Sequence, residues 1–371
     1  MKWYKKEPLA TVGGQSKWIR VADDREQEFV VENYLGKKTD LLGLKKNVVQ
    51  NLTDQLAHFK ETRTSIYHQD DMDLVDSCCI CGFSSDNASL QVSIYGADYV
   101  QCQNCTHVYV KKRPSKAAIE GFYLSDITYA ATYTDKKAAE SRLNAIAVPW
   151  RDWLIEVYGK LYGKKPTTIL DVGSGAGHFV EACRRVGLKA EGIELSESSR
   201  AFSKEVWGIE LDGGDFLEVG EKYSGYDVVT FWGLLEHTPN PAQILSQAYS
   251  IVKESTNGGM VISKLPRWNS LSSAIQSICS STVIRHLDPM GHIMCFTDQS
   301  AAELYYSCKF APKAAWYYGM DVYELFMQMG NNMSDYNVLT GTSNIQLELQ
   351  QKIDDIKFSD GLTLVGTPMD F

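Results

Sequence analysis

Short apolar runs separated by glycine- and acid-containing turns recur between residues 166 and 310. The runs are Ile169–Val172, Glu191–Ser196, Tyr226–Trp232 and Gly258–Ser263. Most intervals between them are long enough for a helix, so turn, strand and helix repeat over about 100 residues. This order is typical of an α/β protein with a doubly wound, mostly parallel sheet.

The rest of the chain shows weaker patterns. Four flanking segments are expected: residues 1–75, a polar and partly helical lead-in with a helix near 48–60; residues 76–115, a small cysteine-rich module; residues 116–165, a helical segment; and residues 311–371, with a helix near 346–356 and a strand near 362–366. The sequence predicts one large domain with a smaller appendage, or two domains.

The first apolar run leads into an acid and three glycines at alternate positions, Asp171-x-Gly173-x-Gly175-x-Gly177. Glycine allows a backbone to turn tightly and to approach a ligand closely. A helix starting near Phe179 would direct its free N–H groups at that ligand. A dinucleotide fingerprint would require a third glycine at position 178, which is histidine. The loop therefore predicts a cofactor site of another class, although a tight turn without a ligand is the alternative.

Two further acids follow at informative intervals. Glu194 comes 23 residues after Asp171, at the end of the second predicted strand. One strand–helix–strand unit is the interval at which a carboxylate accepts hydrogen bonds from ribose hydroxyls. Asp215 and Phe216 follow a Gly-Gly turn after the next helix. Each residue alone could be a solvated turn residue, but the ordered set favours a nucleoside-containing cofactor.

Two cysteine pairs lie upstream of the glycine loop. Cys78 and Cys81 are separated from Cys102 and Cys105 by twenty residues, which is the spacing of a four-thiolate zinc ribbon. Four thiolates leave no open coordination position, so we expect a structural Zn²⁺ site. Two substitutions in the ligand set stay open, Cys79 for Cys78 and His107 for Cys105, and disulfides are the competing interpretation. The scattered remaining cysteines and the start of the chain, which lacks an apolar leader, favour metal in a reducing cytoplasm.

Composition narrows the partners. The 371 residues carry 46 acidic and 37 basic side chains, for a net charge of −9. This sign argues against nucleic acid as a partner, because a phosphate backbone attracts basic surfaces. No apolar run approaches the ~20 residues needed to span a bilayer. We therefore expect a cytoplasmic protein with a small-molecule substrate and leave its oligomeric state open.

The glycine loop resembles motif I of class I S-adenosylmethionine (SAM) methyltransferases. That resemblance implies a seven-stranded, mostly parallel Rossmann-like sheet, completed by residues 311–371, which would also contribute to the acceptor site. It implies SAM as the cofactor, with Asp171 near the methionine ammonium group and the three glycines under the methionine and ribose. The remaining expected cofactor-binding residues are Glu194, Asp215, Phe216 and Trp232.

The order of the other motifs narrows the resemblance. The cysteine ribbon is followed by Arg113-Pro114-Ser115 with Phe122-Tyr123, then by Leu235-Glu236-His237 and by His292-x-x-x-Phe296-Thr297. This order is similar to bacterial zinc-containing methyltransferases, including sugar C-methyltransferases that act on nucleotide-linked deoxysugars and relatives of surface-polysaccharide and secondary-metabolite pathways. It implies C- or O-methylation of a nucleotide-linked sugar or a related small molecule, and a role in carbohydrate biosynthesis.

Methyl transfer to oxygen or carbon also needs a group that removes a proton. His237 follows the predicted strand at the edge of the sheet where ligands bind, so it is the first candidate general base. His292 is the second, and Glu236 could orient His237 or line the methyl pocket. Two rival functions stay open, a non-catalytic SAM-binding scaffold and an NAD-linked sugar oxidoreductase or epimerase.

Overall fold

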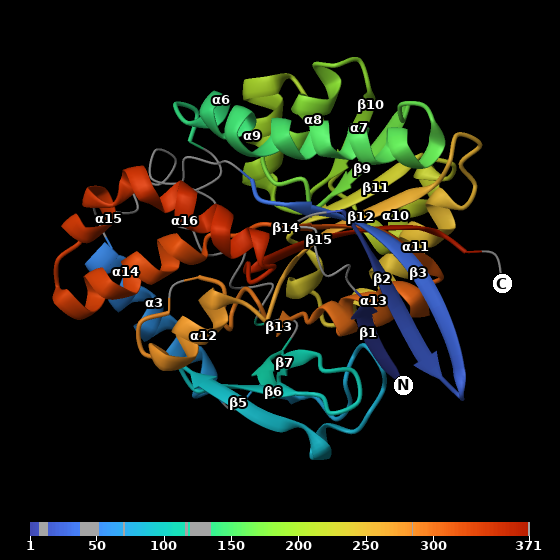
Figure 1. Cartoon of the computed structure of the whole chain (residues 1–371). Helices are drawn as coiled ribbons and strands as arrows, with labels where there is room; N and C mark the ends of the chain where they lie inside the picture. Colours follow the sequence, from blue (N-terminus) through green and yellow to red (C-terminus); the bar gives the residue numbers. More distant parts are fainter. Residues whose placement is uncertain are drawn as a thin grey trace.

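The computed structural model describes residues 1–6, 14–37, 52–69, 71–115, 118, 135–283 and 285–369 (Figure 1). A large twisted sheet forms its centre, with helices on both faces and a small cysteine-rich sheet below it in this view. Phe122 and Tyr123 lie outside the described residues.

The large sheet has nine strands in the described part of the chain. In spatial order they are β1 (Lys2–Lys6), β2 (Gly14–Ala22), β3 (Arg25–Leu35), β14 (Phe310–Tyr317), β15 (Gly361–Pro368), β12 (Met260–Pro266), β11 (Val228–Trp232), β9 (Thr168–Val172) and β10 (Lys189–Ile193). Strands β10, β9, β11 and β12 are mutually parallel, as the recurring apolar runs predict.

The expectation of a seven-stranded, mostly parallel sheet is wrong for this chain. Strand β15 is antiparallel to both β12 and β14, and β2 is antiparallel to both β1 and β3. Antiparallel pairs are therefore as numerous as parallel ones in the described sheet. The alternation of strands and helices predicts parallel strands. It does not predict the order of β14 and β15 in the sheet, because that order depends on the long helical insertion between them.

Strands β1 to β3 extend the sheet from a segment expected to be a partly helical lead-in. They join the sheet because β3 pairs in parallel with β14. Trp3 stacks on Phe29 with a centroid separation of 5.5 Å, and both rings pack on Tyr306 of α13 (Asp298–Ser307). This buried aromatic contact stabilises the packing of the N-terminal strands against α13.

Helices cover both faces of the sheet. On one face lie α6 (Ala139–Arg142), α7 (Val148–Tyr162), α8 (His178–Arg184) and α9 (Glu197–Trp207), and on the other lie α10 (Phe216–Val219), α11 (Pro241–Val252) and α13 (Figure 1). A π-helical turn, 143–147, joins α6 to α7. A separate helical group, visible at the left of Figure 1, contains α3 (Leu52–Tyr67), α12 (Leu271–Ile278), α14 (Asp321–Met333), α15 (Asn337–Gly341) and α16 (Ser343–Asp355).

The cysteine-rich module is not independent of the large domain. Its sheet contains β5 (Ser89–Ile94), β6 (Ala97–Gln101) and β7 (Val108–Val110), and β7 pairs with β13 (Met294–Cys295). A two-stranded ribbon of β4 (Met72–Leu74) and β8 (Lys112–Pro114) closes the module. The hairpin expected between the cysteine pairs is present as β5 and β6. Among the described helices, none has the length and hydropathy of a membrane span.

Candidate active site

The glycine loop joins β9 to α8 at the carboxyl edge of the parallel strands. Gly173, Gly175 and Gly177 all have positive φ, at 72°, 52° and 74°. A Cβ on Gly177 would lie 2.4 Å from Ser203 Oγ, whereas a Cβ on Gly175 would meet nothing within 4 Å. Gly177 is therefore required by packing, and Gly175 faces open space. The N-cap position of α8 is Gly177, and His178 is the first residue of the helix.

Asp171 sits beneath this loop with only 2% of its surface exposed. Its Oδ1 accepts a hydrogen bond of 2.7 Å from Thr230 on the neighbouring strand β11. Burial raises the pKa of Asp171 to about 7, with a smaller contribution from the Glu194 carboxylate. A cation beside this carboxylate would restore its ionised form, because a nearby positive charge favours the charged state.

Glu194 follows β10 and contacts the loop directly. One of its carboxylate oxygens accepts from the backbone N–H of Gly175 over 2.8 Å, and the other accepts from Ser196 over 2.7 Å. The sequence predicted that Glu194 and the glycine loop share one site. The structure brings them together because β9 and β10 are adjacent parallel strands.

The other candidate cofactor residues have different surroundings. Asp215 caps α10 by accepting from the N–H of Leu217, and Phe216 is 5% exposed and packs edge-on against Phe231. Trp232, at the end of β11, is half-buried and stacks on Trp150 with centroids 4.3 Å apart and planes 3° apart. Nothing in the spacing of Trp150 along the sequence predicts this contact between α7 and the end of β11.

The turn after β11 carries a carboxylate and two imidazoles. Glu236 Oε1 lies 3.8 Å from Nε2 of His237 and 3.8 Å from Nε2 of His292. Nδ1 of His237 contacts the backbone carbonyl oxygen of Gly291 at 2.6 Å. Nδ1 of His292 contacts that of His286, also at 2.6 Å. Both Nε2 atoms are thus directed at one carboxylate, which is 3% exposed. The sequence named all three residues, but not their convergence.

Electrostatics keeps His292 neutral. Burial lowers the pKa of His292 to about 4, despite the opposing effect of the Glu236 carboxylate. A neutral imidazole whose Nδ1–H is bound to a carbonyl presents a free lone pair at Nε2. Either proton acceptance or metal coordination is possible at such an atom, and the three ligand atoms of this cluster lie within 4.8 Å of one another.

This turn adjoins the glycine loop. A Cβ placed on Gly173 would lie 3.1 Å from Leu234 Cδ1, just before Leu235–His237. The loop and the Glu236 cluster therefore share the carboxyl edge of β9 and β11, where open α/β sheets bind ligands.

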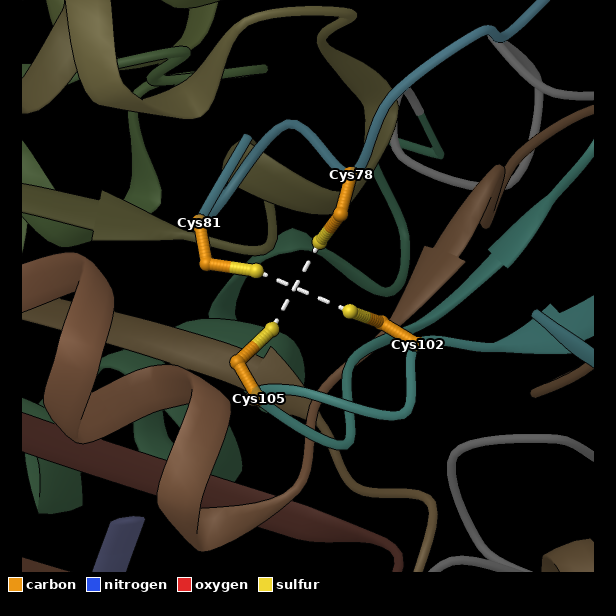
Figure 2. A group of neighbouring side chains, drawn as sticks. All are labelled: Cys78, Cys81, Cys102 and Cys105. Carbon is orange, nitrogen blue, oxygen red and sulfur yellow. Dashed lines mark hydrogen bonds between the residues drawn. The ribbon is translucent and has the colours of Figure 1, made fainter. Parts of the chain in front are cut away.

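The four expected cysteines converge on one point (Figure 2). The Sγ atoms of Cys78 and Cys105 are 3.5 Å apart, and those of Cys81 and Cys102 are 3.6 Å apart. Tetrahedral thiolates on zinc, at Zn–S ≈ 2.3 Å, would be separated by about 3.8 Å. All nine cysteines are free thiols, which argues against the disulfide alternative. Neither Cys79 nor His107 belongs to the cluster.

The cysteine module is bonded to the segment that carries His292. Besides the pairing of β7 with β13, Tyr99 Oη donates to the carbonyl of His292 over 2.9 Å. The N–H of Val110 donates to the carbonyl of Ile293, also over 2.9 Å. These bonds fix the backbone at His292 and at the residues that follow it.

The region that matches known proteins contains the glycine loop and its flanking acids. A methyltransferase domain family matches residues 144–305. The ubiquinone biosynthesis O-methyltransferase of Acinetobacter baumannii (strain ACICU) is 31% identical over 170 residues, which cover 44% of this chain and 69% of that protein. The namesake from Bordetella avium is 30% identical over 165 residues, 43% of this chain and 66% of the relative. The chain belongs to the SAM-dependent methyltransferases.

Solved structures resemble this chain only loosely. The plantazolicin methyltransferase BamL, solved with a substrate analogue and S-adenosylhomocysteine, shares 14% identity at a TM-score of 0.45 and covers 68% of this chain and 94% of its own. The sequence relatives match less than half of this chain. The N-terminal strands, the cysteine module and helices α14 to α16 lie outside the family match at residues 144–305.

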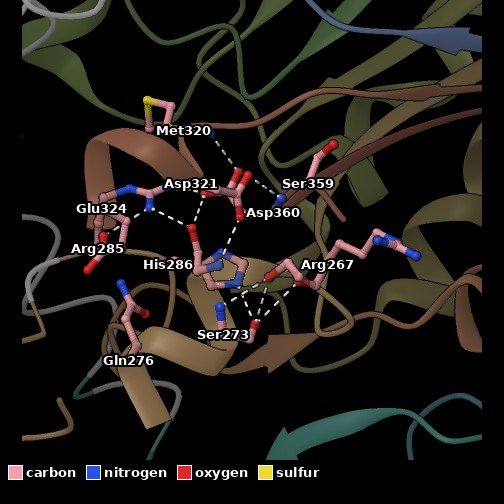
Figure 3. Close-up of polar contacts among 12 residues, drawn as sticks. Arg267, Ser273, Gln276, Arg285, His286, Met320, Asp321, Glu324, Ser359 and Asp360 are labelled. Carbon is pink, nitrogen blue, oxygen red and sulfur yellow. Dashed lines mark hydrogen bonds and ion pairs between the residues drawn. The ribbon is translucent and has the colours of Figure 1, made fainter. Parts of the chain in front are cut away.

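The helical group contributes a buried polar network to the methyltransferase (Figure 3). Arg285 donates to Glu324 over 3.0 Å and also pairs with Asp360. Asp321 accepts from the N–H groups of Ser272 and Asp360, and His286 contacts Ser273 over 2.8 Å. The network joins the segments after β12 and β14, and so holds the carbonyl of His286 that contacts His292.

Proposed function

We propose that this protein transfers the methyl group of SAM to an oxygen or carbon of a small-molecule acceptor, with an imidazole of the Glu236 cluster removing the acceptor's proton. The observation that carries this proposal is that the Nε2 atoms of His237 and His292 both point at one buried carboxylate, beside the glycine loop.

The glycine loop fits the cofactor. Gly175 faces open space, and Glu194 is held against the loop. Asp171 is a buried carboxylate whose ionised form a nearby cation would stabilise. In our proposal, Asp171 binds near the ammonium group, Glu194 takes the ribose hydroxyls, and Asp215, Phe216 and Trp232 surround the base. SAM supplies a methyl group on a positively charged sulfur, so alignment by the protein accounts for much of the rate.

The Glu236 cluster would hold the acceptor's proton. His292 or His237 accepts it at Nε2, and the carboxylate of Glu236 stabilises the imidazolium that forms. Because Glu236 Oε2 is buried without a hydrogen-bond partner in the described structure, it is available to an incoming group. The four cysteines hold a structural Zn²⁺ in this proposal.

The acceptor is proposed as a hydroxylated small molecule. The relatives that match by sequence are named as O-methyltransferases of ubiquinone biosynthesis, which supports oxygen as the methyl acceptor. The order of cysteine ribbon and histidine motifs resembles enzymes that act on nucleotide-linked sugars. Phenolic compounds and nucleotide-linked sugars are therefore the two acceptor classes to assay first.

The test is a methyl-transfer assay with SAM labelled in its methyl group, using wild-type protein and Glu236→Gln, His237→Asn and His292→Asn variants. We expect turnover with one acceptor class. The variant that lacks the catalytic base should show a kcat about 10²–10⁴-fold below that of wild type, the usual effect of losing a general base. Its affinity for SAM should be unchanged. Gln243→Ala, on the first turn of α11, is the matched control. Full activity in all three variants would refute the base assignment.

A further inference from the structure

A cavity lies away from the glycine loop, between the N-terminal strands β1 and β2 and the cysteine module. Its volume is about 300 Å³. None of the residues assigned above to SAM or to the Glu236 cluster lines it. The lining comes from β1, β2, the β6–β7 turn and the segments after β12 and β13. Much of the cavity is therefore built by elements outside residues 144–305, the region that matches the methyltransferase family.

Two cations and one carboxylate lie together in the lining. Arg267 binds Asp298 through two bonds, of 2.7 Å and 3.1 Å, and Lys5 pairs with the same carboxylate. The three side chains are only 8%, 15% and 21% exposed, for Arg267, Asp298 and Lys5 respectively. The two cations hold the pKa of Asp298 well below its usual range, while burial lowers the pKa of Lys5.

Asp298 is the only acidic residue among the described residues that line the cavity. Lys5 and Arg267 both lie over the ring of Tyr317, at 4.9 Å and 5.3 Å from its centroid. The ring face lowers the cost of burying cations but carries no net charge. Glu303, the next acid on α13, is paired with Arg20.

Hydrogen-bond donors are also left over. Lys5 donates to Asp298 and Tyr317, which uses two of its three N–H groups. Arg267 makes four bonds, two to Asp298 and one each to the carbonyls of Asn269 and Lys357, which leaves one of its five N–H groups. Exposed Asn269 and half-buried Gln299 add amides at the cavity.

We propose that this cavity binds an oxyanion, a phosphate or carboxylate group of a small ligand, with Lys5 and Arg267 as its charged donors. A buried cation excess with spare N–H donors is stabilised by an anion, and charge-assisted hydrogen bonds are the stronger kind. The site is separate from the proposed methyl-transfer residues, and the proposal does not depend on the acceptor assignment.

The experiment measures binding of sodium pyrophosphate and sodium citrate to the full-length protein by calorimetry and by thermal unfolding, with ionic strength held constant by NaCl. Wild-type protein should bind at least one of the two anions and gain thermal stability. Binding of pyrophosphate alone would identify a phosphate ligand, and binding of citrate alone a carboxylate ligand. Binding of neither would overturn the proposal.

Lys5→Met is the decisive variant. It removes one cation but leaves Arg267 and Asp298 as a balanced pair, so the variant should be at least as stable as wild type without anion. Its anion affinity should fall about tenfold or more, the loss expected for one charge-assisted bond. Lys2→Met, on an exposed position of the same strand, is the control and should bind normally.

Asn269→Asp provides a second test at an exposed position in the lining of the cavity. The added negative charge at the cavity should weaken anion binding about tenfold or more. Equal anion affinity in wild type, Lys5→Met and Asn269→Asp would place the anion elsewhere and overturn the proposal.

Discussion

The backbone N–H of Gly175 donates to the carboxylate of Glu194 over 2.8 Å, so the glycine loop and the second strand-end acid form one unit. This bond holds Glu194 at the loop before any ligand arrives. A preorganised carboxylate loses less conformational entropy when a ligand binds than one that must be ordered first.

Removing the Glu194 carboxylate should weaken SAM binding. In Glu194→Ala we expect the dissociation constant for SAM to rise about tenfold to a hundredfold, since charged hydrogen bonds contribute about 1.5–3 kcal/mol. Titration calorimetry measures this. Glu197→Ala, at an exposed position in the first turn of α9, is the control and should bind SAM like wild type. Equal affinity in the two variants would remove Glu194 from the cofactor site.

The cysteine cluster predicts one zinc ion per chain. Cys78→Ser should lose the metal and lower the thermal midpoint, because a structural metal contributes directly to folding free energy. Cys79→Ser is a stringent control, since Cys79 is the next residue but lies outside the cluster. Elemental analysis measures the metal content. Zinc retained in Cys78→Ser and lost in Cys79→Ser would reverse the ligand assignment.

A second metal equivalent would change the interpretation of the Glu236 cluster. If Glu236, His237 and His292 act through proton transfer, metal analysis should give the same content in wild type and His292→Asn. Loss of one equivalent in His292→Asn, with the cysteines intact, would show that the cluster coordinates a metal ion.

The bond from Tyr99 to His292 predicts that the cysteine module supports catalysis at a distance. Tyr99→Phe removes a hydrogen bond of 2.9 Å to the His292 carbonyl, so kcat should fall several-fold while SAM affinity stays constant. Tyr95→Phe is the control because Tyr95 donates to the carbonyl of Val283, a different point of contact between the module and the large domain. Equal kcat in both variants would limit the module to a structural role.

His178 predicts a pH dependence of stability. Burial lowers its pKa to about 4, below the value near 6.5 of an unfolded chain. The unfolded state therefore binds this proton first as pH falls, and stability is lost between about pH 6.5 and pH 4. Relative to His178→Phe, the wild type should lose up to about 1.4 kcal/mol per pH unit in this window. Denaturant unfolding at several pH values measures the difference. A constant difference would contradict a buried neutral imidazole.

The sequence predicted the parts of the fold that depend on local pattern. The glycine loop, the strands at Ile169–Val172 and Val228–Trp232, and the four-cysteine cluster follow from spacing that a single segment carries. Pairings between distant segments were missed. The parallel pairing of β3 with β14 and the stacking of Trp150 on Trp232 join residues that no periodicity relates.

The candidate site shows the same division. Glu236, His237 and His292 could be named from their motifs, but their convergence depends on the pairing of β13 with the cysteine module, more than 180 residues upstream. The cavity at Lys5 and Arg267 had no sequence signal, because isolated basic residues in polar strands are ordinary surface residues.

Calorimetric titration of the purified protein with SAM and with S-adenosylhomocysteine tests the central claim most directly. Wild type should bind both, and Gly175→Asp should bind neither, because it places an acid in the open space at the loop. Gly163→Asp, at a glycine of similar positive φ with equally open surroundings, controls for backbone strain and should bind normally. Equal binding by Gly175→Asp and wild type, or no binding by folded wild type, would contradict the account.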